Sequence, residues 1–214
     1  MIRTPRSPMR LLLSAFVVLV VATATVYLPF SSTSVEAGTA RRMDVSGLLD
    51  ASDLAFHGTV LSKRAGLGAH NLIETEYVFQ VKRTYWGQEL TTRVVKLPGG
   101  VLPDGRGLVL AGMPSLNKGE EVLLFLSESS GGGLRMPIGL AQGKFTIQRL
   151  LNGSVRLVRS AAALQLSNPA TGKIEEAPKH SLFDFAQVQA EVLIAAAARR
   201  TRIATGEESA AGAK

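Results

Sequence analysis

A two-residue alternation of side chains runs through residues 72–83. Every second position holds an apolar residue, a threonine or a tyrosine, and charged or polar residues lie between them, with Val78 as the exception; the first set is Ile73, Thr75, Tyr77, Phe79 and Val81. Because successive side chains of a strand point to opposite faces, this pattern predicts an antiparallel strand with one buried face. We expect its partner at 54–62, joined to it by the glycine-bearing segment 64–71.

Further strands are predicted at 90–97, 108–112 and 122–126. Turn signals at 98–100 and 103–105 separate the first two of these segments and leave little room for regular structure between them. Residues 122–126 are continuously apolar, which is typical of a strand that is buried on both faces. We therefore expect this last strand to be central to the core.

Residues 144–151 and 154–159 predict a hairpin around Asn152-Gly153. A two-residue turn would place Arg149 opposite Arg156, which is a like-charge pair. A three-residue loop avoids that pair and gives a single apolar face; its members would be Phe145, Ile147, Leu151, Val155 and Leu157. The longer loop is therefore predicted.

Two helices are expected to flank the strands. The first is a short helix at 44–53, and the second is a longer helix that Ser181 caps with Asp184 as its capping-box partner. The apolar stripe of the second helix is formed by Leu182, Phe185, Val188, Val192 and Ala195. The predicted fold is mainly β: a small, antiparallel, OB-like β-barrel of five to seven strands with a short N-terminal and a longer C-terminal helix.

The amino terminus reads as an export segment. Arg3, Arg6 and Arg10 precede an apolar run at 11–30, and small residues before Gly38 favour cleavage there, so residues 1–37 are a signal peptide or, as the alternative, an uncleaved membrane anchor. The predicted organisation beyond it is a linker, one barrel domain with its C-terminal helix, and a disordered tail, at 38–43, 44–200 and 201–214 respectively. The location is extracytoplasmic in either case: periplasmic, secreted or anchored to the outer face of the membrane.

The sequence contains no cysteine and three histidines, so disulfide frameworks, thiol nucleophiles and cysteine-based metal sites are excluded. His57, His70 and His180 are far apart in the sequence, and we expect neither a metal site nor a cofactor. His57 alternates with Phe56 and is expected to face solvent from its strand. His180 precedes Ser181, whose capping role accounts for it without nucleophilic catalysis.

Two other arrangements suggest chemistry and are explained as structure. Glu74 and Glu76 share a strand face at a spacing that glycosidases also use, but an exposed sheet surface accounts for them. The glycine segments 139–145 and 66–68 lack the spacing and the following helix of phosphate-binding and dinucleotide-binding loops, so they are interpreted as turns. No catalytic residue is therefore predicted.

Lysine and arginine number 24 against 17 aspartates and glutamates, a formal net charge of +7. The basic residues are dispersed, and Tyr85 and Trp86 beside Lys82 and Arg83 form the one aromatic-basic cluster. This cluster is too small for a nucleic-acid groove, and export argues against genomic targets. Adhesion to an anionic envelope surface fits the charge better.

Several segments together resemble a known group of proteins: 52–60, 75–81, 98–100, 112–114, 119–126 and 142–145. The set resembles uncharacterised exported bacterial proteins, and its first two strands are similar to those of netrin-like modules and tissue inhibitors of metalloproteinases, which are five-stranded OB-type barrels. The resemblance spans residues 44–159 and implies a barrel and an association with extracytoplasmic proteins. The inhibitors chelate the protease zinc through an amino-terminal cysteine, so none of their inhibitory residues carries over to this chain.

These observations favour an exported, non-enzymatic binding module that engages another envelope or secreted protein. The alternatives are an accessory or inhibitor of an extracellular metalloprotease, and a hydrolase built from Glu74 and Glu76 or from His57. The expected partner is an extracytoplasmic protein, with membrane contact only through residues 11–30 if they are retained. The candidate protein-binding residues are Pro98, Gly99, Gly100, Asp104, Tyr85, Trp86 and Arg135.

Overall fold

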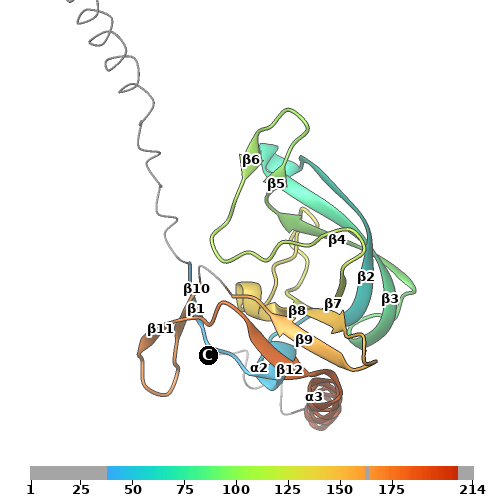
Figure 1. Cartoon of the computed structure of the whole chain (residues 1–214), viewed down its shortest axis with the longest axis vertical. Helices are drawn as coiled ribbons and strands as arrows, with labels where there is room; N and C mark the ends of the chain where they lie inside the picture. The colour runs from blue at the N-terminus through green and yellow to red at the C-terminus, as the bar shows by residue number, and fades with distance from the viewer. Residues whose placement is uncertain (1–37, 162–163, 207–214) are drawn as a thin grey trace, which may run out of the picture. The chain divides into compact units, whose positions relative to one another are not determined.

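The computed structural model describes residues 38–161 and 164–206 (Figure 1). This part is mainly β with two α-helices, as predicted. The expected signal peptide or anchor at 1–37 and residues 207–214 of the expected tail lie outside the described residues. Within the described ranges, no helix has both the length and the apolar character that crossing a membrane requires.

Seven strands form one antiparallel sheet, in the order β12 (Ser181–Asp184), β9 (Val155–Arg159), β8 (Lys144–Arg149), β7 (Glu121–Leu126), β2 (Leu54–Leu67), β3 (Ile73–Trp86) and β4 (Thr92–Pro98). The predicted closure into a barrel is not found, because no pairing within the described ranges joins β12 to β4. The outer edge of β4 is met by a loop instead: the Arg135 amide donates to the Lys96 carbonyl over 2.9 Å. This contact takes up part of the edge that closure would need.

β2 extends to Leu67, beyond the predicted end at residue 62, and β3 extends to Trp86, beyond the predicted end at residue 83. The first half of the expected connection at 64–71 is therefore strand, and the 3-10 helix η1 (Ala69–Asn71) and its neighbours join β2 to β3. The pairing of β2 with β3 is confirmed. Three register shifts interrupt it, between Ala55 and Phe56, between His57 and Gly58, and between Val60 and Ser62. Bulges of this kind bend a strand, and β2 and β3 curve visibly along the sheet (Figure 1).

Two smaller sheets complete the architecture. β5 (Gly100–Val101) pairs with β6 (Gly107–Leu108), so the strand expected at 108–112 is reduced to its first residue. The expected linker at 38–43 is ordered instead: β1 (Gly38–Arg41) pairs in parallel with β10 (Leu164–Ser167), which also pairs with β11 (Ile174–Glu176). A buried amide, Gln142 of η2 (Leu140–Gly143), ties this segment down by accepting from the Met43 amide and donating to the Arg41 carbonyl.

Helices α2 (Val45–Asp50) and α3 (Phe185–Thr205) cover one face of the large sheet. The stripe Val188, Val192 and Ala195 is confirmed as buried. The predicted cap is wrong: Asp184 caps α3 by accepting from the Gln187 amide, whereas Ser181 and the exposed Leu182 belong to β12. The helix also extends through residues 201–205, which were assigned to the tail.

The second face of the sheet has its own core, built by side chains of β2, β3, β4 and β7 and covered in part by the loop before β7. Strand β7 contributes to both cores: Leu123 and Phe125 face the helices, and Val122, Leu124 and Leu126 face the other side. The prediction of a strand buried on both faces is therefore confirmed. The β8–β9 register is also as predicted, since Arg149 lies opposite Val155 rather than Arg156.

Candidate functional site

A groove of about 520 Å³ lies between β3, the turn that follows it and α3. We call it the β3–α3 groove; its polar lining is Lys82, Arg83, Thr84, Glu89, Thr91 and Arg200. Its apolar wall includes Leu90 and Leu193. The sequence presents Lys82-Arg83 and Arg199-Arg200 as separate basic pairs, and the packing of α3 against β3 brings one arginine of each pair into the same groove.

Neutral groups hold the two arginines of the β3–α3 groove in place. The Arg83 guanidinium carbon lies 5.5 Å from the centroid of the Tyr85 ring. Arg200 donates to the Tyr85 carbonyl over 3.2 Å and lies 5.8 Å from the centroid of the Trp86 ring. No carboxylate of the described ranges forms an ion pair with either arginine. Their charge is therefore available to an anion.

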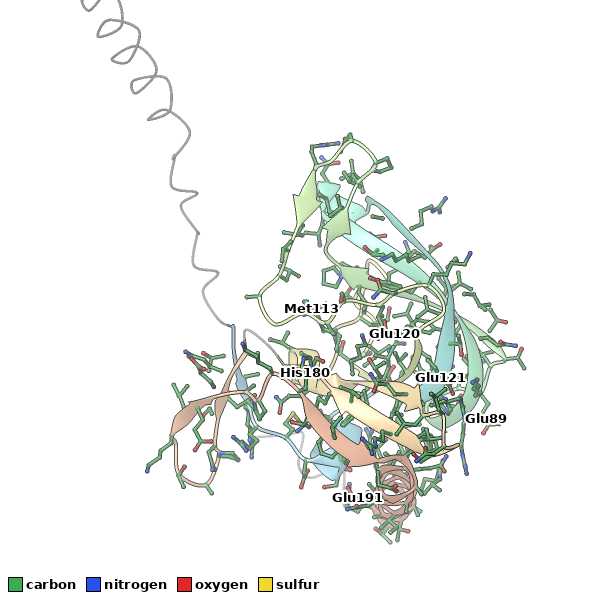
Figure 2. All side chains as sticks on the ribbon, viewed as in Figure 1. Glu89, Met113, Glu120, Glu121, His180 and Glu191 are labelled. Atoms are coloured by element: carbon green, nitrogen blue, oxygen red, sulfur yellow. The ribbon has the colours of Figure 1, made fainter. Side chains whose placement is uncertain are left out.

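Lys82 connects the β3–α3 groove to a charge cluster around Glu121, which Figure 2 labels on β7. The Glu121 carboxylate accepts from Lys82 at 2.7 Å, from Arg149 at 2.8 Å and from the His57 Nε2 at 2.7 Å. Burial raises the pKa of Glu121, but these three donors outweigh it and lower the pKa to about 2. The cluster is therefore anionic at its centre and carries an excess of positive charge around it.

The expectation that His57 faces solvent is wrong. The residue is only 7% exposed, and its ring packs edge-on against Phe185 at 5.7 Å between centroids. The predicted alternation holds, since Phe56 and Val60 belong to the core on one face of the sheet and His57 points to the other face. That second face is covered by α3 instead of solvent. Burial, together with the positive charges of Lys82 and Arg149, lowers the pKa of His57 below its usual value, although the neighbouring Glu121 raises it. A neutral His57 therefore donates its Nε2 proton to Glu121.

Tyr85 and Trp86 are not an exposed stacking pair. Tyr85 is buried in the helix-covered core, its hydroxyl accepts from the Gln189 side chain over 2.9 Å, and burial raises its pKa. Trp86 lies under Arg199, whose guanidinium carbon is 4.2 Å from the ring centroid. Both aromatic residues position basic side chains of α3, a role that sequence reasoning missed because the helix is a hundred residues further along the chain.

Pro98, Gly99 and Gly100 lie at a different place, on a cavity of about 170 Å³ under the loop between β4 and β7. Figure 2 labels Met113 in this loop, and Met113 lines the same cavity. Two valines of the lining, Val101 and Val109, are 64% and 83% exposed. No lysine, arginine, histidine, aspartate or glutamate lines this loop cavity. The cavity is suited to an apolar side chain.

The other two candidate residues are engaged in local structure. Asp104 pairs with Arg106 at 2.8 Å at the tip of the β5–β6 turn. Arg135 pairs with Asp53 at 2.7 Å and donates to the Ser127 carbonyl, which fixes the loop 127–136 against the start of β2. The candidate protein-binding residues near Pro98 and those near Tyr85 therefore do not form one site. Glu74, which pairs with Pro98 across the sheet, is separated from Tyr85 by about 36 Å along the extended strand β3.

Glu74 and Glu76 each have a cationic neighbour. Lys96 donates to Glu74 at 2.9 Å, and Arg64 lies 3.9 Å from Glu76. Glu74 is buried rather than exposed, because the chain at Gly68 closes over its carboxylate. The arrangement gives two ion pairs on neighbouring strands and no adjacent pair of aromatic rings for a sugar.

His180 is bonded to Ser160, not to its sequence neighbour Ser181: its Nδ1 lies 2.8 Å from the Ser160 Oγ. Both residues are exposed, and β12 places them at the outer edge of the sheet. Across residues 38–161 and 164–206, no three histidine, aspartate or glutamate side chains converge in a way that could hold a metal ion.

Of the two glycine-bearing segments that were interpreted as turns, 139–145 contains a turn that leads into a strand, whereas residues 66 and 67 of the other are strand. Gly139 adopts φ +62° at the start of η2, which leads into strand β8 rather than into an α-helix. Gly66 lies in β2.

No protein-family model matches this chain, and no curated protein matches its sequence. The function is therefore inferred from the two surfaces described above.

Proposed function

We propose that this protein is an exported, non-enzymatic binding module that engages another envelope or secreted protein through the loop between β4 and β7. The observation that carries the proposal is the loop cavity, whose rim exposes Val101 and Val109 while its lining includes no charged side chain. An apolar pocket with an exposed apolar rim is a typical site for an anchoring side chain of a partner. The lining of the loop cavity includes no lysine, arginine, histidine, aspartate or glutamate side chain.

The loop is held rigidly enough to present this rim. The Gly99 amide donates to the Ile73 carbonyl over 2.8 Å, and the Thr75 hydroxyl donates to the Gly99 carbonyl over 2.6 Å. These bonds anchor the beginning of the loop on β3. A pre-organised loop loses less conformational entropy when a partner binds.

The test is gentle crosslinking of the protein in native extract, followed by mass spectrometry of the adducts. We expect a defined partner with the native chain, loss of that partner with Val109→Asp, and its retention with Val94→Asp, which places the same charge on the exposed part of β4 outside the cavity. Recovery without any partner, or equal recovery from both variants, would contradict the proposal.

The metalloprotease hypothesis uses the same loop surface and differs in the identity of the partner. Its assay is the rate of substrate cleavage by an extracellular metalloprotease with and without the purified protein. A change in rate that Val109→Asp abolishes would identify the partner class, and a constant rate over a range of protein concentrations would remove this hypothesis.

A further inference from the structure

We propose that the β3–α3 groove binds an acidic polypeptide segment that also carries apolar side chains, supplied by the protein partner. This inference rests on the proposed function and adds the chemistry of the partner. It uses a surface separate from the loop cavity, so the two can be tested independently.

Charge is the first argument. The lining of the β3–α3 groove includes three cationic side chains, Lys82, Arg83 and Arg200, against one carboxylate, Glu89. Lys82 is paired with Glu121, but Glu121 is itself shared with Arg149. The groove therefore keeps an excess of positive charge that favours an anionic ligand.

The positions of the arginines are the second argument. Arg83 is stacked on Tyr85, and Arg200 is fixed by the Tyr85 carbonyl, so neutral groups orient both guanidinium groups without neutralising them. A guanidinium has five N–H donors, and a carboxylate can accept two of them in parallel. Side chains that are oriented before binding lose less entropy when a carboxylate arrives.

The apolar wall is the third argument, and it decides between an acidic peptide and a uniform polyanion. Leu90 and Leu193 are partly exposed beside the cationic groups. A phosphate polymer has no side chain to place against them. Glu89, which Figure 2 labels beside β3, repels any anionic ligand and therefore does not distinguish the two. A peptide that alternates acidic and apolar residues satisfies both the cations and the leucines. A groove of about 520 Å³ has room for a few side chains of such a segment.

The test measures fluorescence anisotropy of a short labelled peptide in which glutamates alternate with leucines, titrated with the purified native protein. The comparison probes are the same peptide with lysines in place of the glutamates, inorganic polyphosphate, and vesicles of phosphatidylglycerol. We expect saturable binding of the acidic peptide, no binding of the basic peptide, and weaker binding of the two phosphate probes.

Variants then locate the site. Arg83→Gln and Arg200→Gln should each weaken peptide binding by about tenfold, the loss of one charge-assisted pair. Arg156→Gln is the control. Arg156 is an exposed residue of β9 outside the groove, so removing its charge should leave binding unchanged. Glu89→Gln should strengthen binding about threefold, because it removes the one repulsive charge of the lining and changes no buried contact.

The outcomes separate this inference from the proposed function. Equal binding by native protein, Arg83→Gln and Glu89→Gln, or preference for polyphosphate or vesicles over the acidic peptide, would overturn the peptide site. The crosslinking test on Val109 would stand in that case, because it reports on the loop cavity and uses no peptide probe. Thermal melting of each variant shows whether it is folded, and Glu89→Gln provides a gain of binding that misfolding cannot produce.

Discussion

The Arg199 guanidinium lies over the Trp86 ring, 4.2 Å from its centroid, and the same side chain donates to two carbonyl groups, of Leu49 over 3.0 Å and of Ser52 over 2.6 Å. One residue of α3 therefore connects β3, α2 and the turn before β2. A planar guanidinium can make these contacts together, whereas an ammonium group cannot.

Arg199→Lys is expected to lower the free energy of unfolding by about 3 kcal/mol, because the charged donors to two carbonyl groups and the stacking on Trp86 are lost together. Chemical denaturation followed by circular dichroism measures this change. Arg202→Lys is the matched control, since Arg202 makes an exposed pair with Asp50 that is worth at most about 0.5 kcal/mol. Equal effects of the two substitutions would contradict the role assigned to Arg199.

The Glu121 cluster is expected to make stability depend on pH in two stages. The pKa of His57 is lowered from 6.5, so its contribution is present above pH 6.5 and is lost as the pH falls below it. The pKa of Glu121 is lowered from 4.5 to about 2, so its contribution is present above pH 4.5 and is lost as the pH falls toward 2. Both groups therefore make the native state less stable in acid.

Glu121→Gln should remove the stage of the stability loss that occurs at the lower pH. It should also lower the free energy of unfolding at neutral pH by about 2 kcal/mol, because Lys82 and Arg149 lose their shared charged acceptor. Denaturation curves of native and variant protein, recorded from neutral pH down to pH 2, give the difference directly. Glu176→Gln, on the exposed strand β11, serves as the control. Parallel pH profiles for the native chain and Glu121→Gln would rule out this assignment.

Gly100→Ala is expected to destabilise the loop between β4 and β7. Gly100 has φ +139°, and an added Cβ would overlap the Thr75 hydroxyl oxygen that bonds to the Gly99 carbonyl. Gly105→Ala is the comparison, since Gly105 also has a positive φ, at +88°, but has open space around its Cβ position. We expect about 1 kcal/mol for Gly105→Ala from the backbone alone and at least about 2 kcal/mol more for Gly100→Ala. Thermal melting that ranks the two in the opposite order would contradict this reading of the loop.

Gln142→Ala should release the segment 38–43 from the domain. The buried amide of Gln142 satisfies the Met43 amide and the Arg41 carbonyl, and its loss leaves both without that partner, at a cost of about 2 kcal/mol. Limited trypsin digestion should then cleave after Arg41 or Arg42 faster than in the native protein. Gln148→Ala, which changes an exposed residue of β8, should leave the cleavage rate unchanged.

The strands and helices were predicted from the sequence wherever a local pattern determined them. The alternation along 72–83 identified the paired strands β2 and β3, and the apolar run at 122–126 identified the strand that carries both cores. The β8–β9 register followed from avoiding Arg149 opposite Arg156. These features depend on residues that are close in the sequence, so periodicity and turn chemistry suffice to find them.

The open sheet and the candidate sites were decided by tertiary structure. Whether seven strands close into a barrel depends on what meets the edges of β4 and β12, and those contacts join distant segments. His57 is buried because α3 packs on its face, and Arg200 reaches Arg83 only through that same packing. A sequence determines which faces of its strands and helices are apolar; the pairing of those faces is fixed by long-range burial, and the β3–α3 groove exists only once that pairing is made.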